Sequence, residues 1–341
     1  MRPAPPTAPA TASAPGKLIL SGEHAVVYGE PAVLLAVDLR VRVRAEPAPT
    51  WTLELPGTPV ARLGGVADLD RRRRELETAH AEFMAGLRPI GEVAPHPVTL
   101  LAYACALAGG DPLRLQIESD LPLGAGMGSS AAVAAAVIAA ILAARKAPAD
   151  PERLIPLALA VERLQHGRPS GADVAAVVRG GLLRFRNGEV ESRRSPPNRG
   201  LRLVDTGRPD SPTGECVEAV RARHGLDRGA WASFGAVAAE IEAAFAGDEE
   251  ERLIRAVRRN HRLLCQIGVV PEPVQALVCE IEAAGGAAKI CGAGAVRGSA
   301  GGMLWTLGPS DPIPALAARR GWRVIEVKGT GTGVEAKGAG R

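Results

Sequence analysis

The stretch that decides the fold reads SDLPLGAGMGSSAAVAAAVIAAIL, from Ser119 to Leu142, a glycine-rich turn that leads into an alanine-rich apolar segment. The preceding residues, Pro112–Ser119, alternate apolar and polar side chains, which is typical of a strand. Glycines at 124, 126 and 128 let successive backbone N–H groups line one concave surface, and such a nest binds anions. A helix beginning near Ser129 adds the positive end of its dipole. The order strand, loop, helix therefore predicts a phosphate site, although a tight turn packed against a neighbouring element would use the same glycines.

Two common nucleotide motifs do not fit this loop. It lacks the G-x-x-x-x-G-K-[ST] pattern of a P-loop, and GAGMGS does not have the G-x-G-x-x-G spacing of a dinucleotide fold. Because backbone dipoles alone leave much of the charge of a triphosphate unpaired, a cation has to reach the loop from elsewhere in the chain.

A second polar cluster lies in APGKLILSGEHAVVYGEPAV, residues 14–33. Gly16 and Lys17 enter the first predicted strand, and Glu23, His24 and Tyr28 occupy the turn that follows it. A lone lysine at the start of a strand usually faces solvent. Turns between strands rarely need Glu, His and Tyr together for structure alone, so this cluster indicates a functional segment.

The third cluster is ERLQHGRPSGAD, in which Glu162 ends a predicted helix and Asp173 follows a turn that contains glycine and proline. Two such carboxylates can divide the work of phosphoryl transfer, one holding Mg²⁺ on a nucleotide and the other accepting a hydroxyl proton. A plain helix end followed by an Asx-type turn is the competing structural interpretation.

These segments occur in the order and spacing of one family, and the chain resembles the GHMP kinases. PLGAGMGSSAA is similar to the phosphate loop of that family, and KICGAGAVRGSAGG is similar to its C-terminal glycine motif. APGKLILSGEHAVVYG has the form typical of its mevalonate kinases. The resemblance spans about Ala14–Val327 and implies an α+β, two-domain fold, with an N-terminal domain like ribosomal S5 domain 2 and a ferredoxin-like C-terminal domain.

The resemblance also implies roles for individual residues, with ATP and Mg²⁺ as cofactors. Asp173 would be the catalytic base, beside Lys17, which would stabilise the developing alkoxide and the γ-phosphate. Glu162 and Ser130 would hold Mg²⁺. The predicted nucleotide-binding residues are Ser119, Gly124, Ala125, Gly126, Met127, Gly128, Ser129 and Ser130. The predicted substrate-binding residues are Lys17, Glu23, His24, Asp173 and Thr213, with Asn260 and Leu264 on a helix that faces the cleft.

The implied reaction is transfer of a phosphoryl group from ATP to the 5-hydroxyl of (R)-mevalonate, for isoprenoid synthesis. Another small alcohol or a phosphorylated acceptor such as phosphomevalonate is an alternative, because Arg168 and Arg297 stand where the family pattern has other residues and could supply extra cations. In the late glycine motif, Cys291 replaces a threonine and AVRGSAGG lengthens the loop. A non-catalytic nucleotide-binding regulator on the same fold is the alternative of a different class.

Composition indicates the number of domains and disfavours several kinds of partner. The chain has 341 residues, 46% of them hydrophobic, which suits two domains, and a formal charge of +4 without aromatic interleaving does not favour nucleic acid as a partner. Five cysteines without a C-x-x-C pair disfavour a disulfide framework and fit a reducing cytoplasm. No apolar run is long enough for a bilayer, so no membrane partner is expected.

Local composition also predicts how the chain divides into domains. Residues 1–13, rich in Pro, Ala and Thr, are expected to form a flexible leader. A polar, proline-rich stretch near 191–200 separates an N-terminal domain, 14–195, from a C-terminal domain, 196–341. Asn187-Gly188 predicts a hairpin turn. The family resemblance further implies a homodimer.

Overall fold

The computed structural model describes residues 8–122, 124–197, 200–309 and 312–338. Its first sheet has the strand order β12-β1-β2-β5-β3-β4, with the hairpin β6–β7 attached to β2. Within this sheet, β3 and β5 run parallel, and the other pairs are antiparallel. The strands are β1 (Ala10–Ser21), β2 (Ala32–Pro47), β3 (Trp51–Glu54), β4 (Ala61–Gly64), β5 (Leu113–Ser119), β6 (Leu182–Arg186), β7 (Glu189–Arg194) and β12 (Glu335–Gly338).

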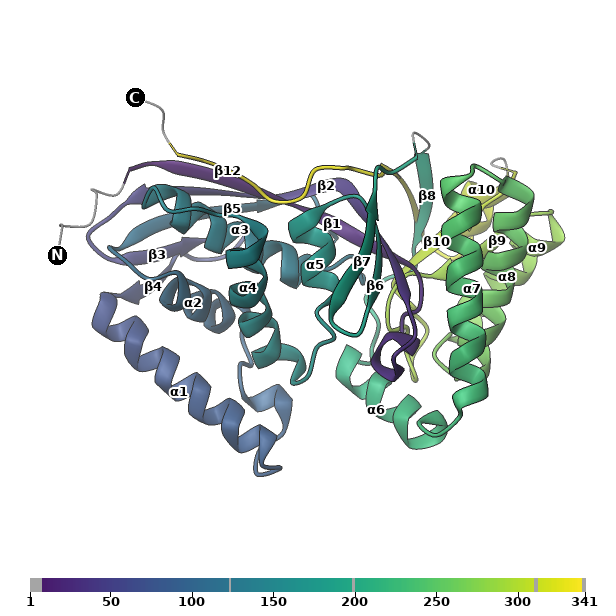
Figure 1. Cartoon of the computed structure of the whole chain (residues 1–341), viewed down its shortest axis with the longest axis horizontal. Helices are drawn as coiled ribbons and strands as arrows, with labels where there is room; N and C mark the ends of the chain where they lie inside the picture. Colours follow the sequence, from purple (N-terminus) through teal and green to yellow (C-terminus); the bar gives the residue numbers. More distant parts are fainter. Residues whose placement is uncertain (1–7, 123, 198–199, 310–311, 339–341) are drawn as a thin grey trace.

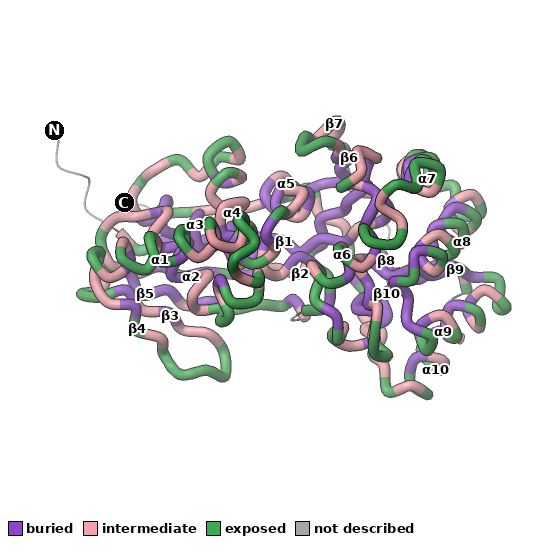
Figure 2. Tube along the Cα trace, turned by 90° about the horizontal axis from the view of Figure 1, so that it is seen from below, coloured by how far each residue is buried: buried purple, intermediate pink, exposed green. Residues whose placement is uncertain are grey.

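The helices of the first domain pack around α3 (Ser129–Ala144), which contacts β1 and β2 on one side and α2, α4 and α5 on the other. Almost all of α3 is buried, and its many alanines let the surrounding elements approach closely. The other helices are α1 (Val66–Met84), α2 (Pro97–Ala108), α4 (Pro151–His166) and α5 (Ala172–Arg179), with short 3₁₀ turns η1 (Ala25–Tyr28) and η2 (Ile90–Glu92). Figure 2 shows the buried segments concentrated in the strands and inner helices.

The second domain lies beside the first along the long axis of the molecule (Figure 1). Its antiparallel sheet has the order β11-β8-β10-β9, and α8 and α9 pack against β9. The strands are β8 (Gly200–Asp205), β9 (Ala287–Ile290), β10 (Met303–Leu307) and β11 (Arg323–Lys328). The helices are α6 (Thr213–His224), α7 (Arg228–Ala246), α8 (Glu250–Gln266), α9 (Glu272–Ala283) and α10 (Pro312–Ala318). This arrangement is the predicted α+β, two-domain fold.

The local sequence signals are visible in the structure. Asn187 and Gly188 both have positive φ, 52° and 85°, as a tight hairpin turn between β6 and β7 requires. Asp150 caps α4 with its side chain, and Gly167 follows the last residue of that helix. Among the described residues, no helix has the length and apolar character needed to cross a membrane.

Both ends of the chain differ from the predicted boundaries. Residues 10–13 were expected in a flexible leader, but they form the start of β1 and pair with β2 and β12; residues 1–7 lie outside the described part. The end of the predicted C-terminal domain returns to the first sheet as β12. In Figure 1 this yellow strand lies along the purple β1. Strand pairing between the two ends of the chain gives no local signal in the sequence.

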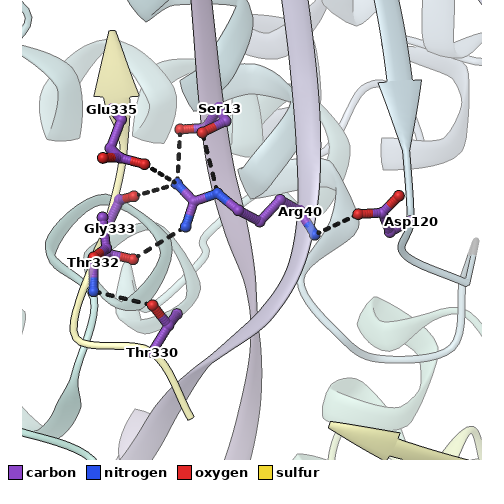
Figure 3. A network of polar contacts seen from close by, with 7 residues as sticks. All are labelled: Ser13, Arg40, Asp120, Thr330, Thr332, Gly333 and Glu335. Atoms are coloured by element: carbon purple, nitrogen blue, oxygen red, sulfur yellow. Dashed lines mark hydrogen bonds and ion pairs between the residues drawn. The ribbon is translucent and has the colours of Figure 1, made fainter. Parts of the chain in front are cut away.

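Arg40 on β2 holds this returning segment in place (Figure 3). Its guanidinium donates to the carbonyl of Gly333 at 2.7 Å and to the carbonyl of Thr332 at 3.4 Å. It also donates to both oxygens of Ser13, at 3.1 and 3.3 Å, and lies 3.6 Å from Glu335. One mostly buried cation therefore joins β1, β2 and the segment that leads into β12.

We expect Arg40→Met to lower the free energy of unfolding by about 2 kcal/mol, because several backbone carbonyls lose a charged donor. Arg42→Met is the matched control on the same strand. The Arg42 side chain is 52% exposed and pairs with Asp120, so its loss should cost less than about 1 kcal/mol. Urea unfolding measures both changes, and equal effects would contradict the role given to Arg40.

Candidate active site

The glycine-rich loop joins the end of β5 to the start of α3. Gly124, Gly126 and Gly128 adopt left-handed φ values of 72°, 84° and 69°. Ala125 and Met127 between them are buried, at 3% and 1% exposure, and anchor the loop to the core. Gly124 and Gly126 face solvent, so the surface they offer is backbone. This is the geometry expected of an anion nest at a helix N-terminus.

The serines at the two ends of this segment, Ser119 and the pair Ser129–Ser130, lie in different surroundings. Ser119, the last residue of β5, accepts a hydrogen bond from the backbone N–H of Leu121 at 3.1 Å, which turns the chain into the loop. Ser129 and Ser130 begin α3, and Gly128 before them provides no side-chain cap. The first N–H groups of α3 therefore lack a side-chain acceptor at the N-cap, a position where an anion binds well.

Lys17 is the cation that the structure brings to this loop. Its side chain is 2% exposed, and Nζ donates to the carbonyl of Gly126 at 3.0 Å. Its backbone N–H donates to the carbonyl of Met127 at 2.9 Å. A methyl group added to Gly128 would lie only 2.8 Å from Cγ of Lys17, so glycine at 128 leaves room for the lysine.

Asp173 lies on the other side of the lysine ammonium. Its Oδ1 is 3.1 Å from Nζ of Lys17, and its side chain is 39% exposed. It occupies the first turn of α5, which begins after Gly171. An ion pair between a buried lysine and a half-exposed carboxylate is thus built directly against the phosphate loop.

Glu162 completes the cluster from the end of α4. Its carboxyl is buried, and the loss of solvent together with the charge of Asp173 raises its pKa to about 7, against a hydrogen bond from Ser130 and the charge of Lys17. His166, one helical turn later, has Nε2 at 3.5 Å from Oε2 of Glu162. Burial lowers the pKa of His166, which favours its neutral form.

This cluster suits a divalent cation bound together with a nucleotide. The pKa of Glu162 is raised first by burial and then by the charge of Asp173, and a cation beside Glu162 and Ser130 would stabilise the charged carboxylate. Within the described ranges, no three His, Cys, Asp or Glu side chains gather into a metal site. A cation here would therefore take its other ligands from phosphate oxygens and water, as Mg²⁺ does.

Glu23 and His24, predicted to bind substrate, are closed off from solvent in this structure. Glu23 pairs with Lys289 of β9, and both side chains have 0% exposure. Nζ of Lys289 also donates to the carbonyl of Ile19 at 3.0 Å. Nε2 of His24 contacts the carbonyl oxygen of Ala293 at 2.9 Å, and burial lowers the pKa of this imidazole. These contacts join the end of β1 and the turn after it to β9 and to the late glycine loop.

The remaining predicted substrate residue, Thr213, lies in the second domain, as do Asn260 and Leu264 of the helix predicted to face the cleft. Thr213 is the first residue of α6, and its side chain is exposed. Asn260 is fully buried on α8 and accepts a hydrogen bond from the Ser21 hydroxyl at 2.5 Å. Leu264 is part of the second hydrophobic core. Among the described residues, no hydrogen bond or ion pair joins these three side chains to Lys17 or Asp173.

The lengthened glycine loop approaches the phosphate loop from the second domain. A methyl group on Gly126 would lie 3.7 Å from Cα of Gly292. Arg297 does not turn toward the phosphate loop but forms a double hydrogen bond with Glu215 on α6, at 2.9 and 3.0 Å. The exposed Arg168 side chain makes no hydrogen bond or ion pair within the part that the structure describes.

Sequence reasoning missed three residues of this region: His166, Lys289 and Arg208. His166 follows Glu162 by one helical turn, and that spacing was a usable signal. Lys289 stands inside the apolar strand AAKI, where a buried lysine requires a partner that the local sequence does not name. Arg208 lies beside Gly124, a contact across the two domains that no local pattern predicts.

Comparisons with known proteins place the chain in one family. The family model described as the GHMP kinases N terminal domain matches residues 97–181, which include the phosphate loop, Glu162 and Asp173. A mevalonate kinase from Pyrococcus abyssi is 32% identical over 93% of this chain and 98% of its own length. The mevalonate kinase structure from Methanococcus jannaschii superposes with a TM-score of 0.74 at 19% identity, covering 94% of this chain and 98% of its own. The structure of L. major mevalonate kinase in complex with R-mevalonate superposes with a TM-score of 0.66 at 21% identity, covering 94% of this chain and 96% of its own.

Proposed function

The chain belongs to the mevalonate kinase family, and from this we propose that it transfers the γ-phosphoryl group of ATP to the 5-hydroxyl of (R)-mevalonate. The products are 5-phosphomevalonate and ADP, an early step of isoprenoid synthesis. The observation that carries the proposal is the Lys17–Asp173 pair, 3.1 Å apart and set directly against the phosphate loop. We also place the enzyme in the cytoplasm, where its five cysteines, all free in the structure, stay reduced.

Asp173 and Lys17 serve the acceptor hydroxyl. Asp173 accepts the proton of the 5-hydroxyl as the new oxygen–phosphorus bond forms and the bond from the γ-phosphorus to the β-phosphate oxygen breaks. The Lys17 ammonium stabilises the negative charge that develops on the attacking oxygen and on the transferred group. Because Nζ is already fixed by Gly126 and Asp173, little reorganisation is needed in the transition state.

The loop and the start of α3 bind the nucleotide. Backbone N–H groups of Gly124–Ser130 receive the ATP phosphates, with the dipole of α3 behind them. Ser130 and Glu162 would hold Mg²⁺, which when bound neutralises part of the charge on the β- and γ-phosphates. Glu23, His24 and Thr213 remain the predicted substrate residues on the acceptor side.

A phosphorylated acceptor gains no support from Arg297, because this arginine is engaged by Glu215. The experiment that separates the acceptors is ADP release measured with mevalonate, phosphomevalonate, homoserine and galactose. We expect turnover with mevalonate and at most about a hundredth of that kcat/KM with the other three. ADP release with phosphomevalonate alone would make phosphomevalonate the acceptor. Nucleotide binding without any turnover would favour a non-catalytic regulator.

A further inference from the structure

We propose that Arg208, from the second domain, binds the phosphates of ATP together with the glycine-rich loop. The inference rests on the proposed function, because it takes ATP as the bound nucleotide. Arg208 follows β8 in the segment DTGRPDSPTGE, residues 205–215, of which the sequence assigned only Thr213 to the site. The proposal makes nucleotide binding a property of both domains.

The backbone around Arg208 is fixed against the phosphate loop. The Thr206 hydroxyl donates to the carbonyl of Gly302 at 2.8 Å, and the N–H of Gly301 donates back to that hydroxyl at 2.9 Å. The N–H of Met303 then donates to the carbonyl of Ala125, inside the phosphate loop, at 3.0 Å. Arg208 is therefore carried on a backbone that is bonded, through the 301–303 segment, to the loop itself.

The side chain of Arg208 lies over the first glycine of the loop. A methyl group added to Gly124 would lie 3.2 Å from Cγ, Cδ and Nε of Arg208, so the stem packs along this glycine. The residue is exposed, and within the described ranges its guanidinium forms no ion pair or hydrogen bond. An arginine with a fixed stem and a free guanidinium, at the rim of an anion nest, is suited to bind phosphate oxygens.

The charges at the loop also leave a need for this second cation. The Lys17 ammonium is partly committed to Asp173 and to the carbonyl of Gly126. The triphosphate carries several negative charges, and the loop itself has no basic side chain. Arg297, the other arginine of these facing loops, is already paired with Glu215. Arg208 can therefore supply the second cation beside Lys17, whereas Arg297 is engaged elsewhere.

The test is the affinity for the magnesium complex of AMPPNP, a nonhydrolysable ATP analogue, measured by titration calorimetry without any acceptor. We expect Arg208→Ala to raise Kd at least tenfold, and Arg208→Lys to raise it less, because a point charge replaces the planar fork. Arg297→Ala, which removes the same charge from the facing loop, should stay within twofold of the unsubstituted protein. Thermal unfolding checks that all variants fold.

Two outcomes would overturn the proposal: binding by Arg208→Ala within twofold of the unsubstituted protein, or an equal loss in Arg297→Ala. The measurement contains no acceptor, so it does not depend on mevalonate being the substrate. If the unsubstituted protein binds the analogue but does not turn over mevalonate, the proposed function fails while the assignment of Arg208 is judged on its own.

Discussion

Asp173→Asn should lower kcat with mevalonate by about 10³-fold or more, because asparagine cannot take the hydroxyl proton and positioned proton transfer contributes on this scale. The affinity for the nucleotide should change little, because the loop and α3 provide the anion site without Asp173. Steady-state kinetics give kcat, and calorimetry with Mg-AMPPNP gives the affinity. The two measurements together separate loss of the base from loss of the site.

The matched control is Asp70→Asn on the polar face of α1, which removes the same charge from a residue outside the cluster. It should leave kcat within twofold. Asp173 is 39% exposed, and asparagine has nearly the same size and keeps an oxygen that can accept from Nζ of Lys17, so the replacement should not prevent folding. If Asp173→Asn keeps more than a tenth of the turnover, another group accepts the proton and the mechanism is wrong.

Glu162→Gln should make the ligand-free protein more stable at pH 8 while turnover falls by about 10²-fold or more, since a neutral amide holds Mg²⁺ poorly. The pKa of Glu162 is raised to about 7 in the folded protein, from an ordinary value of 4.5. Between these values the folded state binds the proton more readily than the unfolded chain, so rising pH lowers stability. Above pH 7 the penalty is about 3 kcal/mol, part of which the lost contacts of the carboxylate would offset in Glu162→Gln.

This penalty predicts a pH-dependent difference between the two proteins. In urea unfolding, the free energy of unfolding of Glu162→Gln should be about 2 kcal/mol higher than that of the unsubstituted protein at pH 8. The difference should close toward pH 5, where Glu162 is protonated in the folded protein. Glu152→Gln, at the exposed start of α4, is the control and should show no such gap. A Glu162→Gln protein that is less stable at pH 8 would mean that the carboxylate is well compensated without a metal.

The sequence predicted those parts of the fold whose cause is local. The turn at Asn187 and the strand before the glycine loop both depend on neighbours within a few positions. The pairing of β1 with β12 was not predictable, because it joins the two ends of the chain and is held by Arg40, far from either. Residues 10–13 look like a flexible leader by composition, but partner strands on both sides satisfy their backbone.

In the site, too, local relations could be predicted from the sequence, whereas contacts between distant segments could not. Glu162 and Asp173 lie on one short helix–turn–helix segment, so their proximity followed from the sequence, and the need for a distant cation led to Lys17. The burial of Glu23 did not follow, because its partner Lys289 comes from a strand of the second domain. Arg208 was missed for the same reason, since its contact with Gly124 exists only once the domains meet.

The most direct measurement is identification by ³¹P and ¹³C NMR of the product formed from (R)-mevalonate and MgATP. The proposed mechanism predicts one phosphomonoester on the C5 oxygen for each ADP formed, and about 10³-fold slower formation of this product, or slower still, when Asp173 is replaced by asparagine. A phosphoryl group on another oxygen, or ATP hydrolysis to inorganic phosphate with mevalonate unchanged, would contradict it.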